Sequence, residues 1–327
     1  GKSMFYLGID AGGTKTSFML INHLGEVLST YTSGTCHIHQ VGFDGFRKGI
    51  QEGIDKICSE INICRDDLSY SFLGLPAYGE NESEKLKMNS IIAEILGENK
   101  FSCGNDVEVA LAGSLAGQPG ICIILGTGAI ASGITNDLKT ARTSGWGYIC
   151  GDEGSGYWIA KKGVEIFGKQ SDHRLERTAL YDIFKNELKL ENDFDLIFLI
   201  KDKYKQDRTK VANLAMLVYK AALKGDKYAL DIYRQAAKEC LLMVNGLTNQ
   251  LEFTGVLNIS YSGSVFNSKE FILDPLRNYL QDNYTAFNLT APILPPIKGA
   301  ALNALKLHKG EIPEGVVHNL AKEPKEI

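Results

Sequence analysis

The sequence contains one short pattern twice: a strand, a turn rich in glycine, a second strand and a polar turn. The first copy has its glycine turn at Gly13 and its polar turn at Asn22, and the second has them at Thr127 and Asn136. The polar turn follows by nine residues in both, and the copies are offset by 114 residues. That offset is about one domain length, as an internal duplication would give. The chain is therefore expected to consist of two related α/β halves.

The hydrophobic pattern around each copy predicts helices packed on a mixed sheet. Strands are expected at 4–9, 16–21, 27–32, 70–75 and 101–104, with helices at about 43–61 and 83–96 and one opening near 107. The second half repeats this with strands at 120–125, 129–134 and 257–261 and with apolar helix stripes at 211–222 and 232–247. A turn-prone linker at 117–120 then predicts domains at 1–117 and 118–327.

The composition of the chain indicates which class of ligand the protein binds and in which cellular compartment it is expected. The chain has 327 residues and a formal net charge of −4, without the basic excess that a nucleic-acid-binding protein usually carries. Its seven cysteines are scattered and form no C-x-x-C pair, so a reducing, cytoplasmic location is expected. The apolar run at 4–9 ends at Asp10, too early for a signal peptide or a membrane span. The expected ligand is a small molecule, not nucleic acid or a membrane.

The first glycine turn, 10–16, closes the first strand and leaves backbone N–H groups free to hold an anion. It is not a Walker P-loop, because Thr14 stands where that motif needs lysine. Its position after a strand allows an ordinary hairpin as well as a phosphate site. Asp10 favours the phosphate site slightly, because Mg²⁺ on phosphates prefers one or two nearby carboxylates. The second turn, 126–128, repeats the device, and two such turns could hold one polyphosphate.

Four segments, the two glycine turns among them, resemble the actin-like sugar kinases. The segments are Gly8 to Thr16, Gly126-Thr127-Gly128, Gly263-Ser264-Val265 and Gly299-Ala300-Ala301. Segments 144–148 and 151–160 narrow the resemblance to N-acetylglucosamine kinases of the BadF/BadG-type ATPase family. The resemblance runs from about residue 6 to residue 305 and implies a two-domain actin-like ATPase (ribonuclease H-like) fold. In that fold the nucleotide and the sugar bind in the cleft between the domains.

The resemblance also implies roles for individual residues. ATP would be bound by Gly12, Gly13, Thr14, Lys15, Gly126, Thr127, Gly128, Ala212, Gly263 and Ser264, with Asp10 holding Mg²⁺. Asp106 matches the catalytic base, which would take the proton of a sugar hydroxyl. The sugar would be lined by Asn105, Asp106, Gly145, Trp146, Gly147 and Asp152. The family implies a homodimer.

Each of the acidic and aromatic residues also has a structural interpretation. Asp106 precedes a helix and is expected to cap it if it is not a base. Asp152 lies before a helix start, where a carboxylate complements the helix dipole, and Trp146 could belong to the core. The loop after the third strand departs from the family, because Cys36 stands nearest to the usual asparagine. His37 is expected to take over that sugar contact, and His37 with His39 lacks the third ligand of a metal site.

The glycine turns predict phosphoryl chemistry, and the resemblance implies an ATP-dependent kinase that phosphorylates the C6 hydroxyl of an N-acetylated amino sugar. N-acetylglucosamine is the first candidate, N-acetylmuramic acid, with a lactyl ether at C3, is a close one, and glucosamine is an alternative. A less favoured alternative is the ATPase activator of a 2-hydroxyacyl-CoA dehydratase, whose dimer holds an iron–sulfur cluster. Cys122 and Cys150 are the cysteines that this alternative would use.

Overall fold

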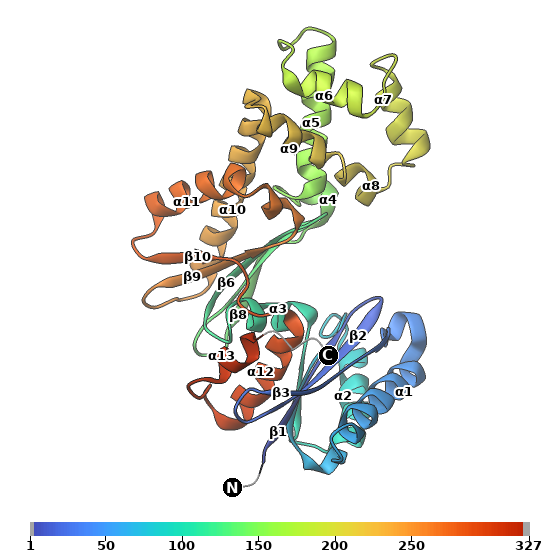
Figure 1. Ribbon diagram of the computed structural model, residues 1–327, viewed down its shortest axis with the longest axis vertical. Helices are drawn as coiled ribbons and strands as arrows, with labels where there is room; N and C mark the ends of the chain where they lie inside the picture. The colour runs from blue at the N-terminus through green and yellow to red at the C-terminus, as the bar shows by residue number, and fades with distance from the viewer. Residues whose placement is uncertain (1–2, 323–327) are drawn as a thin grey trace. The chain divides into compact units, whose positions relative to one another are not determined.

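The computed structural model describes residues 3–322 and divides them between two compact units. The first unit contains the chain up to Gln118 together with the segment from Pro292 onward, and the second extends from Pro119 to Ala291. Each unit is built on one five-stranded sheet with helices packed against it (Figure 1). The α/β class predicted from the sequence is confirmed.

The first sheet has the order β3-β2-β1-β4-β5. Strands β1 to β3 form an antiparallel meander, and β4 and β5 run parallel to β1. The bounds are β1 Phe5–Ala11, β2 Lys15–Asn22, β3 Val27–Gly34, β4 Leu68–Gly74 and β5 Phe101–Gly104. The helices of this unit are α1 Ile38–Ser59, η1 Arg65–Asp67, α2 Glu82–Leu96, α3 Asp106–Ser114, α12 Pro296–Lys309 and α13 Val316–Ala321.

Successive side chains of β1 point to opposite faces of this sheet, as the period of a strand requires. Leu7 and Ile9 belong to the core under α1 and α2, while Tyr6 belongs to a second core under α3 and α12. Gly8 also points toward α12, and a Cβ there would come within 2.3 Å of the backbone nitrogen of Ala301. The first unit is thus a sheet covered on both faces.

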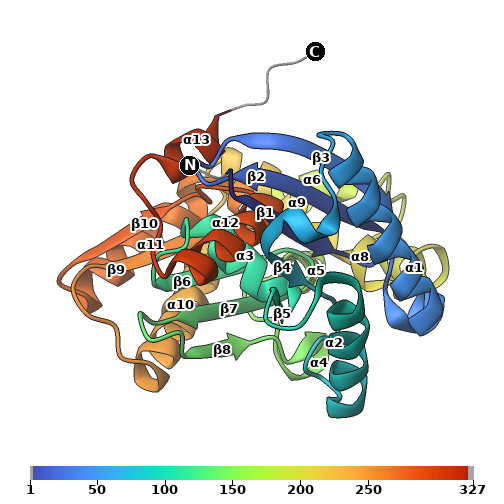
Figure 2. The ribbon, with the colours of Figure 1, turned by 90° about the horizontal axis from the view of Figure 1, so that it is seen from below.

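The second sheet has the matching order β8-β7-β6-β9-β10, and Figure 2 shows β6, β7 and β8 side by side. Its strands are β6 Gly120–Leu125, β7 Ala129–Ile134, β8 Thr140–Ser144, β9 Leu257–Ser262 and β10 Phe287–Thr290. The first eight helical elements are α4 Gly147–Cys150, α5 Gly156–Ser171, α6 Ala179–Glu187, α7 Asp195–Phe198, η2 Leu199–Lys203, α8 Arg208–Ala212, α9 Ala215–Leu223 and α10 Lys227–Gln250. Two more follow β9, η3 Ser264–Ser268 and α11 Glu270–Asn283.

The expected second domain, 118–327, requires a correction at its end. The segment from Pro292 belongs to the first unit, because α12 packs on β1, β4 and α3. Gly299 makes this contact close: a Cβ there would lie 2.3 Å from the backbone nitrogen of Gly113 on α3. The small residues of Gly299-Ala300-Ala301, which contributed to the resemblance, therefore serve helix packing in this chain.

Two further expectations differ in detail. The stripe at 211–222 is interrupted, because α8 ends at Ala212 and α9 begins at Ala215. Strands β8 and β10 were not foreseen, since both are short and lie at sheet edges. Of the helices that the structure describes, none combines the length and the apolar character that a bilayer crossing requires.

Candidate active site

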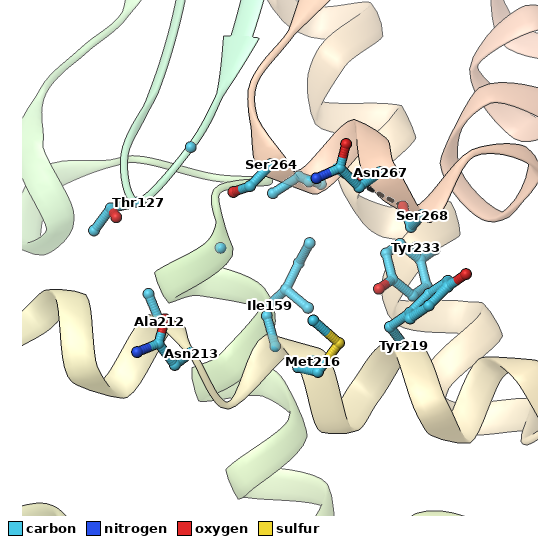
Figure 3. Close-up of a pocket in the computed structure, with 14 residues that line it drawn as sticks. Thr127, Ile159, Ala212, Asn213, Met216, Tyr219, Tyr233, Ser264, Asn267 and Ser268 are labelled. Carbon is cyan, nitrogen blue, oxygen red and sulfur yellow. Dashed lines mark hydrogen bonds between the residues drawn. The ribbon is translucent and has the colours of Figure 1, made fainter.

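A cavity of about 220 Å³ opens in the second unit, beside the end of β6 (Figure 3). In Figure 3, Ser264 and Asn267 of η3 face Ala212, Asn213 and Met216 of the α8–α9 segment. The residues that line the cavity are Gly126, Thr127, Gly156, Ile159, Ala212, Asn213, Ala215, Met216, Tyr219, Tyr233, Ser264, Val265, Asn267 and Ser268. None of these carries a charge at neutral pH. Apolar walls with a few hydroxyl and amide groups are typical of a site for an uncharged ring system.

Backbone hydrogen bonds hold the second glycine turn at the mouth of this cavity. The N–H of Gly126 donates to the carbonyl of Gly128 at 2.9 Å, which closes the turn between β6 and β7. The N–H of Gly156, at the start of α5, donates to the carbonyl of Gly126 at 2.7 Å. Gly263 has φ +100°, and a Cβ there would lie 2.3 Å from the carbonyl oxygen of Leu125. The turn is thus fixed by α5 on one side and by η3 on the other.

The structure brings four of the predicted ATP residues together around this cavity, namely Gly126, Thr127, Ala212 and Ser264. Gly128 and Gly263 do not line the cavity, but each is the chain neighbour of a residue that does, Thr127 and Ser264. Sequence reasoning missed Ile159, Asn213, Met216, Tyr219, Tyr233, Asn267 and Ser268. Asn213 and Asn267 each stand within three residues of a predicted position, and that proximity was the available signal. Tyr233 comes from the second turn of α10, where the sequence pattern predicts an ordinary core residue.

The first glycine turn lies in the first unit, where it joins β1 to β2. The N–H of Gly12 donates to the carbonyl of Lys15 at 2.8 Å. The side chains of Thr35 and Gln40 donate to the carbonyls of Gly12 and Gly13, each at 3.0 Å. Both carbonyls are thereby engaged from the β3–α1 side. Gly13, Thr14 and Lys15 are exposed, so their N–H groups and side chains remain accessible to a ligand.

Asp10 and Asp106 form an acidic pair next to this turn. Burial raises the pKa of the Asp10 carboxyl, the nearby Asp106 carboxylate raises it further, and Lys15 lowers it. Asp10 is half-buried at the end of β1, whereas Asp106 is exposed at the start of α3. Two carboxylates beside a glycine turn are the ligand type that Mg²⁺ with phosphates prefers, so the residues present fit that ion.

The start of α3 separates two interpretations of Asp106. The helix is capped by Asn105, whose side-chain oxygen accepts from the N–H of Glu108 at 3.0 Å. Within residues 3–322, the side chain of Asp106 makes no hydrogen bond or ion pair. The capping role considered for Asp106 therefore belongs to Asn105. Asp106 occupies the first helical turn with a free carboxylate, as a proton acceptor needs.

The segment around Trp146 presents an aromatic side chain to solvent. Trp146 is 70% exposed, which excludes the core interpretation. Ser144, Gly145 and Gly147 all have positive φ, between 62° and 83°, so the chain turns sharply here. A Cβ at Gly145 would press on Ile130 at 3.2 Å. The segment holds the indole away from its own sheet and leaves its face open.

Asp152 lies against the second glycine turn and is 4% exposed. Its Oδ1 accepts from the N–H of Ala129 at 3.1 Å. Its Oδ2 lies 3.1 Å from where a Cβ of Gly128 would stand and 3.9 Å from Nη1 of Arg208. The structure therefore puts this predicted sugar residue beside a predicted phosphate turn. Arg208 was missed, because no pattern in the sequence relates it to Asp152.

The loop after β3 does not present Cys36 as expected. Cys36 is 2% exposed, lies in the core under α1, and its sulfur accepts from the hydroxyl of Thr16 at 3.4 Å. It has little surface to offer a sugar. His37 caps α1 instead, with its Nδ1 accepting from the N–H of His39 at 3.1 Å. The Nε2 of His39 pairs with Glu84 on α2 at 3.0 Å.

The chain is similar to known proteins over most of its length. The model of the BadF/BadG/BcrA/BcrD ATPase family matches residues 7–304. The chain belongs to this family. An N-acetyl-D-glucosamine kinase from Dictyostelium discoideum is 31% identical over 314 residues, covering 93% of this chain and 98% of that protein. An N-acetylmuramic acid/N-acetylglucosamine kinase from Clostridium acetobutylicum is 31% identical over 283 residues, covering 86% of this chain and 91% of that protein.

The fold also matches solved structures of sugar kinases. The ROK hexokinase of Thermus thermophilus superposes with a TM-score of 0.58 at 18% identity, covering 92% of this chain and 98% of that one. At this identity the match concerns the fold alone, and it agrees with the expected two-unit α/β architecture.

Proposed function

We propose that this member of the family is an ATP-dependent amino sugar kinase that transfers the γ-phosphoryl group to the C6 hydroxyl of N-acetylglucosamine. The observation that carries the proposal is the division of chemistry between the two glycine turns. The turn at 126–128 opens on an uncharged cavity, and the turn at 10–15 stands beside two carboxylates. A nucleoside suits the first environment, and a phosphoryl transfer to a hydroxyl suits the second.

The cavity of the second unit has the chemistry of a nucleoside site. Ile159 and Met216 offer apolar surface to a base, and the amides of Asn213 and Asn267 offer both donors and acceptors to its edge. Ser264 stands at the mouth, where a ribose hydroxyl would need a partner. Thr127 continues this surface toward the phosphates. The roles of Gly128, Ala212 and Gly263 in ATP binding are part of the same proposal.

Asp106 is the proposed catalytic base. A sugar hydroxyl is a weak nucleophile, and a carboxylate within hydrogen-bond reach orients it and accepts its proton. The O6–P bond forms as the bond from the γ-phosphorus to the β,γ-bridging oxygen breaks, and ADP leaves with the bridging oxygen. Asp106 suits the task because its carboxylate is free of protein partners within residues 3–322. Thr14, Lys15 and the N–H group of Gly13 are proposed to hold the transferred phosphoryl group. Gly12, whose own N–H donates to the carbonyl of Lys15, is proposed to leave room for it.

Asp10 is proposed to position Mg²⁺ on the phosphates. When bound, the ion would offset the negative charge of the phosphate oxygens. A carboxylate at the end of β1, held close to Asp106, is an energetically costly arrangement, because burial and a like charge both favour the protonated form. A cation at this place would relieve the cost. The acidic pair is therefore consistent with a cation partner.

The sugar is proposed to contact Asn105, Asp106, His37, Asp152 and the exposed face of Trp146, with the backbone of Gly145 and Gly147 near it. An indole face is a good surface for a sugar ring or an acetyl methyl group. Cys36 is left out of this set because its thiol is buried. We propose that His37 lies near C3 of the sugar and that a lactyl group there would contact it. Its Nδ1 is engaged by the N–H of His39, and its Nε2 remains available for the lactyl carboxylate.

A panel of acceptors tests the proposal. The purified protein is incubated with MgATP and with N-acetylglucosamine, N-acetylmuramic acid, glucosamine or glucose, and ADP release and the site of phosphorylation are measured. We expect the highest kcat/KM with N-acetylglucosamine and a 6-phosphate product. A higher kcat/KM with glucosamine would replace the N-acetylated substrate by the free amine. ATP hydrolysis without transfer to any of the four would overturn the kinase proposal.

The dehydratase-activator alternative has a separate test in the same preparation. It requires iron and cysteine ligands, and its two candidates differ in access: Cys122 is buried within β6, while Cys150 is exposed on α4. An iron-free, colourless protein after anaerobic purification would remove this alternative.

We further propose a cytoplasmic homodimer. Light scattering measures the molar mass in solution. A mass near twice the 35.9 kDa of the chain supports the homodimer, and a mass equal to that of the chain contradicts it.

A further inference from the structure

The second glycine turn carries a fixed negative charge that the proposed ATP site must tolerate. The carboxylate of Asp152 accepts from the N–H of Ala129, the first residue after the turn, and fills the space beside Gly128. Asp152 has φ +59°, a backbone conformation that costs energy for a residue other than glycine. Its position is thus set by the surrounding structure. A polyphosphate bound at the same turn would be repelled by this carboxylate unless a cation stands next to it.

Arg208 is the cation that stands there. Its Nη1 lies 3.9 Å from Oδ2 of Asp152, and its guanidinium carbon lies 5.6 Å from the ring centroid of Tyr148, within the range of a cation–π contact. Tyr148 in turn meets Tyr157 of α5 edge-on, with ring centroids 5.4 Å apart. Two aromatic rings and one carboxylate therefore locate the guanidinium.

The donors of this guanidinium remain unused. Within residues 3–322, Arg208 donates no hydrogen bond, and the distance of 3.9 Å to Asp152 is too long for one. Its side chain is 44% exposed, so a ligand can reach it. An arginine that is held in place with its planar fork of N–H donors free has the geometry that phosphate oxygens match. The same helix, α8, ends at Ala212 in the wall of the cavity.

We propose that Arg208 is a phosphate-binding residue that works as a pair with Asp152: it offsets the carboxylate and donates to phosphate oxygens of the bound nucleotide. This rests on the proposed function in one respect, namely that the cavity takes the nucleoside part of ATP. The pair would also connect the two substrates, because Asp152 is proposed to contact the sugar. Loss of Arg208 therefore leaves Asp152 as an uncompensated negative charge at the phosphate turn.

The test is a double-mutant cycle on nucleotide affinity. MgATP, MgADP and adenosine are titrated by calorimetry into the wild type, Arg208→Gln, Asp152→Asn and the double variant. We expect Arg208→Gln to weaken MgATP at least tenfold and adenosine less than twofold, since adenosine has no phosphate. In the Asp152→Asn background the same change should weaken MgATP about threefold or less, because the repelling carboxylate is gone.

Two controls separate charge from fold. Lys210→Gln removes another exposed cation of α8 that does not line the cavity, and its MgATP affinity should match the wild type. For Arg208→Ala, added guanidinium ion should restore part of the MgATP affinity, while the same concentration of sodium chloride should not. Restoration by guanidinium is a result that a purely structural role for Arg208 would not give.

The outcomes are distinct. Equal losses for MgATP and adenosine, or equal losses in both Asp152 backgrounds, would overturn the pairing, as would an unchanged MgATP affinity in Arg208→Gln. None of these depends on a sugar, so they leave the proposed function standing. A wild-type protein that binds neither MgATP nor MgADP would overturn the proposed function and this inference with it.

Discussion

The two glycine turns have the same backbone plan and opposite surroundings. Each joins the first two strands of its sheet, and the two sheets have matching strand orders. The turn after β1 stands beside the half-buried Asp10 and the free carboxylate of Asp106. The turn after β6 opens on an uncharged cavity, and its charged neighbours are paired as Asp152 and Arg208. Two sheets with matching strand orders thus carry an acidic turn on one copy and a turn beside an uncharged cavity on the other.

The backbone of the turns sharpens this comparison. Neither Gly12 nor Gly128 has a positive φ, so neither turn needs glycine for its conformation. The need is for space: a Cβ at Gly128 would lie 3.1 Å from Oδ2 of Asp152, and one at Gly12 would lie 3.3 Å from the carbonyl oxygen of Lys15. Substitutions in the two turns therefore test crowding of neighbouring protein and ligand atoms and not a strained φ.

The largest effect is expected on the acidic side. Asp106→Asn keeps the size of the side chain and removes its capacity to accept a proton, so kcat should fall by about 10²-fold or more. MgATP affinity should change little, because Asp106 is proposed to act on the sugar hydroxyl and not to bind the nucleotide. Steady-state kinetics together with calorimetry measures both quantities.

A matched control exists on the neighbouring helix. Glu82 occupies the first turn of α2 and is exposed, as Asp106 is in α3, so Glu82→Gln removes an equivalent charge from a helix N-terminus. It should leave kcat unchanged. Near-normal kcat in a folded Asp106→Asn protein would contradict the base assignment and would assign Asp106 to helix stability alone.

The next effect concerns Asp152, which lies against the second glycine turn and is also proposed to contact the sugar. Asp152→Ala removes a buried charged acceptor and leaves donors unpaired, at a cost of roughly 1.5–3 kcal/mol. The KM for the sugar should therefore rise more than tenfold. An unchanged sugar KM with a changed MgATP affinity would move Asp152 wholly to the nucleotide side. The Asp152→Asn variant keeps the shape and shows how much of the loss is due to charge.

The parts of this comparison that depend on local pattern could be predicted from sequence. The strands other than β8 and β10, the two turns and the long helix α10 follow from hydrophobic period and from glycine placement. The match between the copies follows from their spacing. The segment from Pro292 could not be assigned to the first unit, because its partners are the backbones of Gly8 and Gly113, nearly 200 residues or more away in the chain. The local sequence around a glycine does not show whether a helix from a distant part of the chain packs against its backbone.

The site could be predicted only in part, for a related reason. Thr127 and Ser264 belong to turns that contain glycine, so sequence reasoning found them. Tyr219 and Tyr233 reach the cavity from helices whose apolar stripes give no sign of a ligand. Cys36 was aligned with a sugar-binding asparagine, yet the chain turns its thiol under α1, and side-chain direction at a loop is set by tertiary packing.

A smaller effect compares the turns directly. Gly12→Ala and Gly128→Ala should each weaken MgATP, by about three- to tenfold, because a methyl group takes space near the phosphates. Gly128→Ala should have the larger effect, since its Cβ also displaces Asp152. Gly168→Ala on α5 is the control, because a Cβ there has open space. Equal losses for MgATP and sugar in a variant would indicate misfolding instead of a phosphate contact.

The smallest effect is a dependence on pH that distinguishes the acidic turn. Burial and Asp106 raise the folded-state pKa of Asp10 above its unfolded value. The charged form therefore costs stability at neutral pH, and the cost disappears as the pH falls through the raised folded pKa and below the unfolded one. Asp10→Asn should raise Tm at pH 7 by a few degrees at most, at about 2–4 °C per kcal/mol for a unit of this size. The gain should shrink toward pH 4, while activity is lost at every pH.

Asp67 is the matched case with a pKa shift of the opposite sign, because hydrogen bonds from Cys64 lower its pKa. Asp67→Asn should therefore lower Tm at pH 7, and this loss should vanish as the pH falls below the ordinary range of a carboxyl. Tm changes of the same sign in the two variants, in thermal scans from pH 8 down to about pH 2.5, would contradict the assignment of a like-charge pair to the first turn. It would also remove the contrast between an acidic and a neutral copy of the same fold.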